Sequence, residues 1–192
     1  ELSAAIIRGY QGNALSDDES ILACAKHYLA YGESTGARDA QEAPISERTV
    51  REIFLPPFKK AVEAGCATFM SAYLAIDGTP VTASRKYLRS ILKEELGFDG
   101  FVVTDWNNVG ALADWQFVAR DIDEATQMAA VAGNDMFMST SECYDALIRL
   151  VREGKLPEKL IDEAVGRILK IKFSMGLFDN PRKTNCARRP ER

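Results

Sequence analysis

The residues best suited to chemistry in this sequence end a short apolar run that begins after Gly100. The run, Phe101–Asp105, is rich in β-branched residues and is typical of a buried strand, and Trp106 follows it directly. Parallel α/β folds place their catalytic side chains at the carboxyl ends of strands. The Asp105 carboxylate could attack or stabilise an electron-poor carbon there, and the indole of Trp106 offers a flat apolar face to a sugar ring.

Polar and aromatic side chains also follow the other strand-like runs. The sets at these strand ends are Lys26 with His27, Ser71 with Tyr73, Asp105 with Trp106, and Met138 with Ser139. Because parallel strands end at the same edge of a sheet, we expect these side chains to share a pocket. Lysine and histidine supply directional donors for hydroxyl groups, so the mixture favours carbohydrate chemistry. Taken singly, each residue also has a structural explanation, such as a lysine that reaches solvent or a tyrosine at the edge of the core.

Strand-like runs alternate with helix-like segments along the chain. The four strand-like runs are Ile21–Lys26, Ala67–Ala72, Phe101–Asp105 and Asn134–Met138. The segments with helical periodicity are Ser46–Ala64, which Pro56–Pro57 must interrupt or restart, Ser84–Leu96, Glu124–Ala132, Cys143–Arg152 and Pro157–Ser174. This alternation predicts parallel βαβ units, and the apolar strands predict a sheet that is covered on both faces.

Two parallel α/β architectures fit this pattern, an open doubly wound sheet and a TIM-type (β/α)8 barrel. The sequence contains neither GxGxxG nor GxxxxGK[ST], so the nucleotide-binding form of the open sheet loses its main support. A complete barrel takes about 250 residues, whereas this chain has 192. The expected fold is therefore a partial barrel of about four β/α units.

Composition narrows the classes of partner and cofactor. With 46% hydrophobic and 27% charged residues, the chain is of an ordinary globular type. A formal net charge of -4 predicts no binding to nucleic acid, and no run approaches the ~20 apolar residues of a membrane helix. The single histidine, His27, and cysteines without CxxC spacing argue against a zinc site. We expect no metal and no organic cofactor.

Five separated motifs occur in an order typical of one enzyme family. They are Ala25–Tyr28, Ser46–Arg48, Phe54–Phe58, Gly97–Trp106 and Met175–Phe178. With these motifs the chain resembles glycoside hydrolase family 3, the retaining exo-acting β-glucosidases and their relatives, over nearly all its length. The resemblance implies that residues 1–178 form the later part of an N-terminal (β/α)8-type barrel. Residues 179–192 would then begin an interdomain linker or tail.

The same resemblance implies roles for the residues at the strand ends. Asp105 would be the nucleophile, and Tyr73 would lie close to it. Lys26 and His27 would hold hydroxyls of the sugar in the −1 subsite, and Trp106 would form part of the platform for the leaving group in the +1 subsite. The implied substrate is a β-glucoside or oligosaccharide, and a secreted or periplasmic location is favoured.

The resemblance also implies that these residues hold only part of the active site. A retaining mechanism needs a second carboxylate as acid/base, about 5–5.5 Å from the nucleophile. In the glucosidase branch this glutamate comes from a domain after the barrel, and the earlier barrel strands would lie before Glu1. The missing barrel half and the C-terminal domain are therefore expected partners. The hexosaminidase branch is disfavoured, because Ala30–Gly32 stands where that branch has Gly-His-Gly.

Two alternatives stay open at this point. The chain could be a barrel fragment that binds a sugar or a partner and catalyses nothing by itself. It could also belong to a β-xylosidase of the same family, since the aromatic Trp106 after Asp105 favours a glucosidase only weakly.

Overall fold

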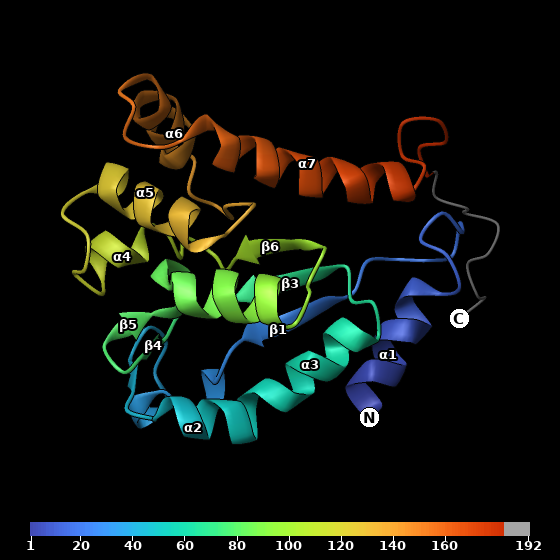
Figure 1. Cartoon of the computed structure of the whole chain (residues 1–192), viewed down its shortest axis with the longest axis horizontal. Coiled ribbons are helices and arrows are strands. Elements are labelled where there is room, and N and C mark those ends of the chain that lie inside the picture. Colours follow the sequence, from blue (N-terminus) through green and yellow to red (C-terminus); the bar gives the residue numbers. More distant parts are fainter. Residues whose placement is uncertain (183–192) are drawn as a thin grey trace, which may run out of the picture.

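The computed structural model describes residues 1–182 and shows an α/β fold built around a parallel sheet (Figure 1). The sheet has three strands in the order β1-β3-β6, which are β1 (Cys24–Tyr28), β3 (Thr68–Ser71) and β6 (Phe101–Thr104). Thr68 lies in register with Cys24 on one side and with Phe101 on the other. Because all three strands run in parallel, their carboxyl ends lie at one edge of the sheet.

Helices precede, connect and follow these strands. The α-helices are α1 (Leu2–Gln11), α2 (Glu47–Thr49), α3 (Leu55–Glu63), α4 (Ala111–Asp114), α5 (Ile122–Ala132), α6 (Glu142–Arg152) and α7 (Glu158–Ser174). Two π-helical segments are η3 (Val50–Phe54) and η5 (Lys86–Glu95). Short 3-10 turns are η1 (Tyr31–Glu33), η2 (Thr35–Ala37) and η4 (Val81–Ala83).

The predicted helix over Ser46–Ala64 is confirmed, together with its interruption at the two prolines. Ser46 caps the N-terminus, because its side chain accepts a hydrogen bond of 3.2 Å from the backbone N–H of Thr49. A new helix, α3, then begins at Leu55 with proline in its first turn, where proline is tolerated because the N–H groups of a first turn have no partner within the helix. The other four predicted helical segments correspond to η5, α5, α6 and α7.

The strand predictions are right for β3 and β6 and wrong in part for the other two. The first strand begins at Cys24 instead of Ile21, because the side chain of Gln11 accepts from the N–H groups of Ala23 and Ala67 in place of the ladder. Within residues 1–182, Asn134–Met138 forms a single bridge, from Met136 to Val103, and no strand.

The segment Asn134–Met138 cannot extend the ladder because its hydrogen bonds converge. The N–H groups of Asp135 and Met136 both donate to the carbonyl of Val102, at 2.8 Å and 3.0 Å. An extended strand would instead alternate its bonding direction from one residue to the next. The segment therefore lies beside β6 without becoming a regular strand.

The main core lies between the sheet and the helices α3 and η5. The fully buried ring of Tyr28 packs edge-on against Phe58 of α3, with 5.1 Å between ring centroids. The Tyr28 hydroxyl donates to the backbone carbonyl of Tyr87 in η5 at 3.0 Å. On β3, Phe69 contacts Phe98 at a centroid distance of 4.6 Å. These contacts hold the strands in place beneath their carboxyl ends.

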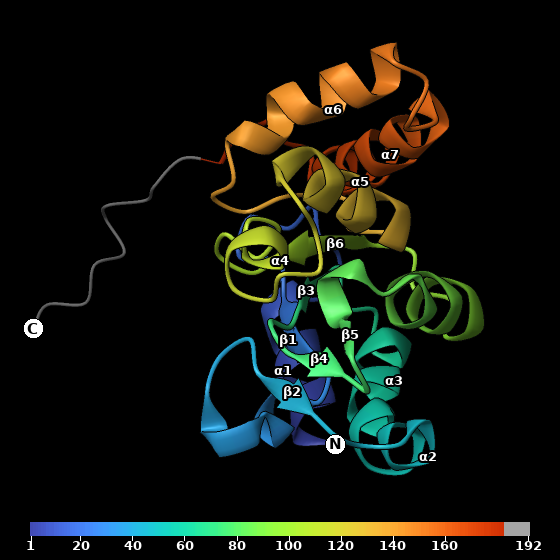
Figure 2. The same cartoon turned by 90° about the vertical axis from the view of Figure 1, so that its left-hand side faces the viewer.

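Short elements at the carboxyl ends of the strands are absent from the sequence predictions. A small sheet contains β2 (Glu42–Ala43), β4 (Ala75–Ile76) and β5 (Thr79–Pro80), and β4 and β5 form a hairpin through Asp77–Gly78. Figures 1 and 2 place this sheet and α4 on the side where the main strands end. Elements of two to four residues, including the short helix α4, are too short to show a hydrophobic periodicity in the sequence. None of the helices in the described part of the chain is both long and apolar enough to cross a membrane.

Candidate active site

The structure brings His27 of β1 and Asp105 after β6 into contact, although β3 lies between their strands. The distance from His27 Nε2 to Asp105 Oδ2 is 3.2 Å. The other carboxylate oxygen of Asp105 accepts from the backbone N–H of Trp106 at 2.7 Å. The side chains of His27 and Asp105 keep 26% and 15% of their surface exposed. Asp105 is therefore oriented by two groups and still reachable by a ligand.

A local irregularity in β1 presents Lys26 and His27. Ala25 pairs with Phe69 and Tyr28 pairs with Ser71, so the first strand has one residue more than its partner between these pairs. Such a bulge re-aims the side chains within it. Lys26 is exposed, and its side chain makes no hydrogen bond or ion pair with the residues in 1–182, so its ammonium is available to a ligand.

The surroundings of His27 act on its protonation in both directions. Burial lowers the pKa of His27 most, and the positive charge of Lys26 adds to this effect. The carboxylates of Asp105 and Asp39 raise the pKa, but the net direction is down. A histidine with a lowered pKa is a neutral hydrogen-bonding group at pH 7.

A loop residue that the sequence analysis did not assign, Tyr31, packs on this histidine. The rings of Tyr31 and His27 lie 4.6 Å apart between centroids at an angle of 37°. The hydroxyl of Tyr31 donates to the carboxylate of Asp39, and this hydrogen bond raises the pKa of Tyr31 to about 12. The sequence did not point to the Tyr31–Asp39 pair, because both residues lie in a loop of short turns in which Asp39 is one of several charged residues.

Tyr73 and Trp106 lie together beside Asp105. The hydroxyl of Tyr73 donates to the backbone carbonyl of Trp106 at 2.5 Å. Burial and the negative charge of Asp105 raise the pKa of Tyr73 to about 12, so the phenol stays protonated at neutral pH. The Trp106 side chain is 66% exposed and is free to contact a ligand.

Two other residues at the predicted strand ends, Ser71 and Met138, have structural roles. Ser71 is fully buried, and its hydroxyl donates to the side-chain oxygen of Asn134 at 3.0 Å. Met138 contributes its backbone, since its carbonyl accepts from the N–H of Asn107 at 3.0 Å and its own N–H donates to Thr104 Oγ1 at 2.9 Å. These bonds hold the loop that follows Asp105 against its neighbour.

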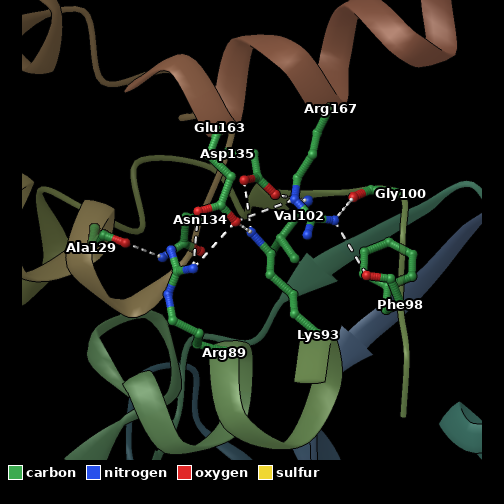
Figure 3. A network of polar contacts seen from close by, with 10 residues as sticks. All are labelled: Arg89, Lys93, Phe98, Gly100, Val102, Ala129, Asn134, Asp135, Glu163 and Arg167. Atoms are coloured by element: carbon green, nitrogen blue, oxygen red, sulfur yellow. Dashed lines mark hydrogen bonds and ion pairs between the residues drawn. The ribbon is translucent and has the colours of Figure 1, made fainter. Parts of the chain in front are cut away.

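Below the candidate site, a buried network of charges ties β6 to its surroundings (Figure 3). Lys93 of η5 forms an ion pair of 2.7 Å with Asp135, and both side chains are only 3% exposed. The second oxygen of Asp135 accepts from the backbone N–H of Val102 at 2.8 Å. Burial is the main influence on both groups; it raises the pKa of Asp135 and lowers that of Lys93.

Two residues of α7 complete this network from the opposite side. Glu163 pairs with Arg89 at 3.0 Å, and it also lies 3.8 Å from Lys93. Arg167 donates to the backbone carbonyls of Phe98 and Gly100, at 3.2 Å and 2.9 Å. The network therefore acts on the amino-terminal end of β6, whereas Asp105 lies after its carboxyl end.

Comparison with known proteins identifies close relatives. Residues 1–171 match the model of the family described as glycosyl hydrolase family 3 N terminal domain. A lysosomal beta glucosidase of Dictyostelium discoideum is 38% identical over 188 residues, which are 94% of this chain and 23% of that protein. A beta-xylosidase of Formosa agariphila is 35% identical over 193 residues, which are 95% of this chain and 27% of that protein.

Solved structures share the fold as well. A beta-glucosidase involved in saponin metabolism from intestinal bacteria superposes with a TM-score of 0.93 and is 42% identical. The match covers 97% of this chain and 25% of that protein. This chain thus spans about a quarter of the length of the relatives that it matches.

Proposed function

The chain belongs to glycosyl hydrolase family 3, and we propose that it supplies the nucleophile and part of the −1 subsite of a retaining, exo-acting β-glucosidase. The observation that carries this proposal is the position of Asp105. Its carboxylate follows β6, an outer strand of the parallel sheet, contacts His27 and stays accessible. The names of the two glucosidases that the chain resembles support glucose as the terminal sugar.

In the proposed reaction, one oxygen of Asp105 forms a bond to the anomeric carbon while the bond from that carbon to the leaving-group oxygen breaks. An acid outside residues 1–192 protonates the leaving oxygen. Its conjugate base later takes a proton from water, whose oxygen attacks the same carbon and frees Asp105. The N–H of Trp106 holds the carboxylate in a fixed orientation during both steps. No step in this reaction needs a cofactor.

The neighbouring residues would bind the sugar and the leaving group. Lys26 would donate to hydroxyls of the terminal glucose. Neutral His27, whose one N–H faces Asp105 through Nε2, would accept from a hydroxyl through Nδ1. Tyr73 is a protonated phenol whose single proton is donated to the carbonyl of Trp106, so it would position Trp106 and offer its hydroxyl oxygen to the substrate as an acceptor. Trp106 offers its exposed ring to the leaving group in the +1 subsite.

The remaining parts of the enzyme belong to this proposal. Residues 1–178 would form the later part of a (β/α)8-type barrel, with residues 179–192 leading to the next domain; residues 183–192 lie outside the described part of the chain. The open edges of the main sheet would pair with the missing barrel half. The acid/base would come from the C-terminal domain, and the enzyme would be secreted or periplasmic.

The test is covalent labelling of the full-length protein that contains this chain. A 2-deoxy-2-fluoroglucoside with a good leaving group should trap a glycosyl-enzyme on Asp105, which peptide mass spectrometry would locate. The Asp105→Asn variant should not be labelled, whereas the exposed Asp114→Asn variant on α4 should be labelled normally. Labelling of another residue, or full turnover by Asp105→Asn, would show the assignment to be wrong.

The β-xylosidase alternative is supported by the xylosidase among the relatives. The two substrates differ in the hydroxymethyl group of glucose, so the ratio of kcat/KM for aryl β-glucoside and aryl β-xyloside separates them. A non-catalytic fragment would hydrolyse neither substrate and would take up no label.

A further inference from the structure

Three exposed aromatic side chains lie on the proposed +1 residue and on the segment that follows it. Trp106, Trp115 and Phe117 lie within a short stretch of chain and are 66%, 55% and 81% exposed. Aromatic side chains of this size usually contribute their area to the core. Exposed apolar side chains that cluster beside a site therefore point to a ligand or a partner.

Tyr73 connects this surface to the proposed nucleophile. Its ring lies 6.2 Å from that of Trp115 between centroids, with 32° between the planes. Its hydroxyl donates to the carbonyl of Trp106, and its own carbonyl accepts from Gln116 Nε2 at 2.7 Å. The segment that carries Trp115 is thus fixed to the residue beside Asp105.

The backbone of this segment is anchored while its rings stay outside. The N–H groups of Val118 and Ala119 both donate to the carbonyl of the fully buried Leu112, at 2.9 Å and 3.1 Å. Phe117 has a φ of 51°, in the left-handed region that a bulky residue occupies only at a cost in energy. The chain accepts this conformation at a residue that gains almost no burial, so folding of residues 1–182 does not explain the ring.

We propose that Trp115 and Phe117 extend the acceptor site beyond Trp106 and select β-glucosides whose aglycone is large, flat and apolar, such as an aryl or fused-ring alcohol. This inference rests on the proposed function. Trp115–Ala119 has no charged residue, and the amide nitrogen of Gln116 is already bound to Tyr73. The surface therefore offers aromatic area more than donors for the hydroxyls of a second sugar, and its link to Tyr73 favours an aglycone as occupant over a separate protein.

The test compares two non-hydrolysable ligands on the full-length protein, 2-naphthyl and methyl 1-thio-β-glucoside, by calorimetry. For Trp115→Ala, Kd of the naphthyl ligand should rise about tenfold, the loss expected for one aromatic contact with its buried area, and Kd of the methyl ligand should stay within about twofold. Trp115→Phe should keep most of the affinity, and Phe117→Ala should lose a smaller factor. Phe173→Ala is the matched control, since this ring of α7 is also exposed, at 63%, and contacts Phe178.

Kinetics with the matching O-glucosides give an independent reading. The loss for Trp115→Ala should appear in kcat/KM for the naphthyl substrate and not in the hydrolysis rate of the glycosyl-enzyme, because the aglycone has left by then. Equal losses for both ligands, or none for either, would overturn the inference. If the ligands bind with the expected selectivity but no glucoside is cleaved, the proposed function is wrong and the aromatic site stands.

Discussion

Removal of one charge from the buried Lys93–Asp135 pair should loosen the strand that leads to Asp105. In Lys93→Met, the Asp135 carboxylate keeps its hydrogen bond from the N–H of Val102 but loses its ion-pair partner. Since the Asp135 side chain is 3% exposed, water cannot replace the ammonium without local opening. The perturbation therefore acts on the amino-terminal end of β6.

The size of the effect follows from the imbalance between attraction and desolvation. At the 2.7 Å between Nζ and Oδ1, an effective dielectric constant of about 20 gives an attraction of about 6 kcal/mol. The burial of two charges costs a comparable amount, so the intact pair contributes little net stability. Loss of one partner leaves the second cost uncompensated, which should lower the free energy of local unfolding by about 3–5 kcal/mol.

Peptide-resolved hydrogen exchange of the full-length protein measures this change in the affected region. Protection of peptides that cover Phe101–Thr104 and Asn134–Met138 should fall by about two to almost four orders of magnitude. Lys60→Met, which breaks an exposed pair with Glu63 on α3, is the matched control and should leave these peptides unchanged. The double variant Lys93→Met/Asp135→Asn removes both charges and keeps an acceptor for Val102, so much of the protection should return.

The pH dependence of the Lys93→Met variant gives a second check. Burial already raises the pKa of Asp135, and loss of Lys93 should raise it further. A carboxyl whose folded pKa exceeds its unfolded pKa is destabilising at pH above the folded value, and the penalty disappears as pH falls through it. The exchange defect should therefore shrink at lower pH. An unchanged exchange rate in Lys93→Met, or additive defects in the double variant, would refute the reasoning.

Two further predictions concern single groups. Because Asp105 raises the pKa of His27 against the larger effect of burial, Asp105→Asn should lower the NMR titration midpoint of His27 further, and a raised midpoint would contradict this. Since the folded pKa of His27 lies below the unfolded one, His27 adds stability as pH rises between the two values. Gly100→Ala should destabilise the protein by about 1–3 kcal/mol, because a Cβ would lie 2.0 Å from the carbonyl oxygen of Ala67. Gly166→Ala in α7, where a Cβ would meet nothing within 4 Å, should stabilise the protein by about 0.5–1 kcal/mol. Thermal unfolding of both variants measures the sign of each change.

The parts of the fold that sequence reasoning located are those with a repeated pattern. Phe101–Asp105 and Ala67–Ala72 are apolar runs of strand length, and both correspond to strands whose residues are almost all buried. The helical segments from Ser46 onward show apolar spacing of three and four. Family membership was also predictable, because its motifs are separated along the chain and keep their order.

Elements that depend on distant partners were not predictable in this way. Asn134–Met138 reads as a strand, but Asn134 bonds to Ser71 and Asp135 bonds to Lys93, residues that are 63 and 42 positions away. Before the start of β1, the side chain of Gln11 likewise takes the place of a neighbouring strand as hydrogen-bond acceptor. No local propensity reports such contacts, since each requires the folded arrangement of several elements.

Two aspartates show why the candidate site could be predicted better than its support. Asp105 ends an apolar strand-like run, whereas Asp135 lies near the start of one, so residue type alone does not distinguish them. In the structure the Asp105 side chain is 15% exposed and faces His27, whereas Asp135 is 3% exposed and held by Lys93 and the N–H of Val102. A carboxylate that must meet a substrate needs a path to solvent, and one that anchors a strand needs enclosure. The topology of parallel strands predicts the first environment at strand ends, while the second depends on which helices pack across the sheet.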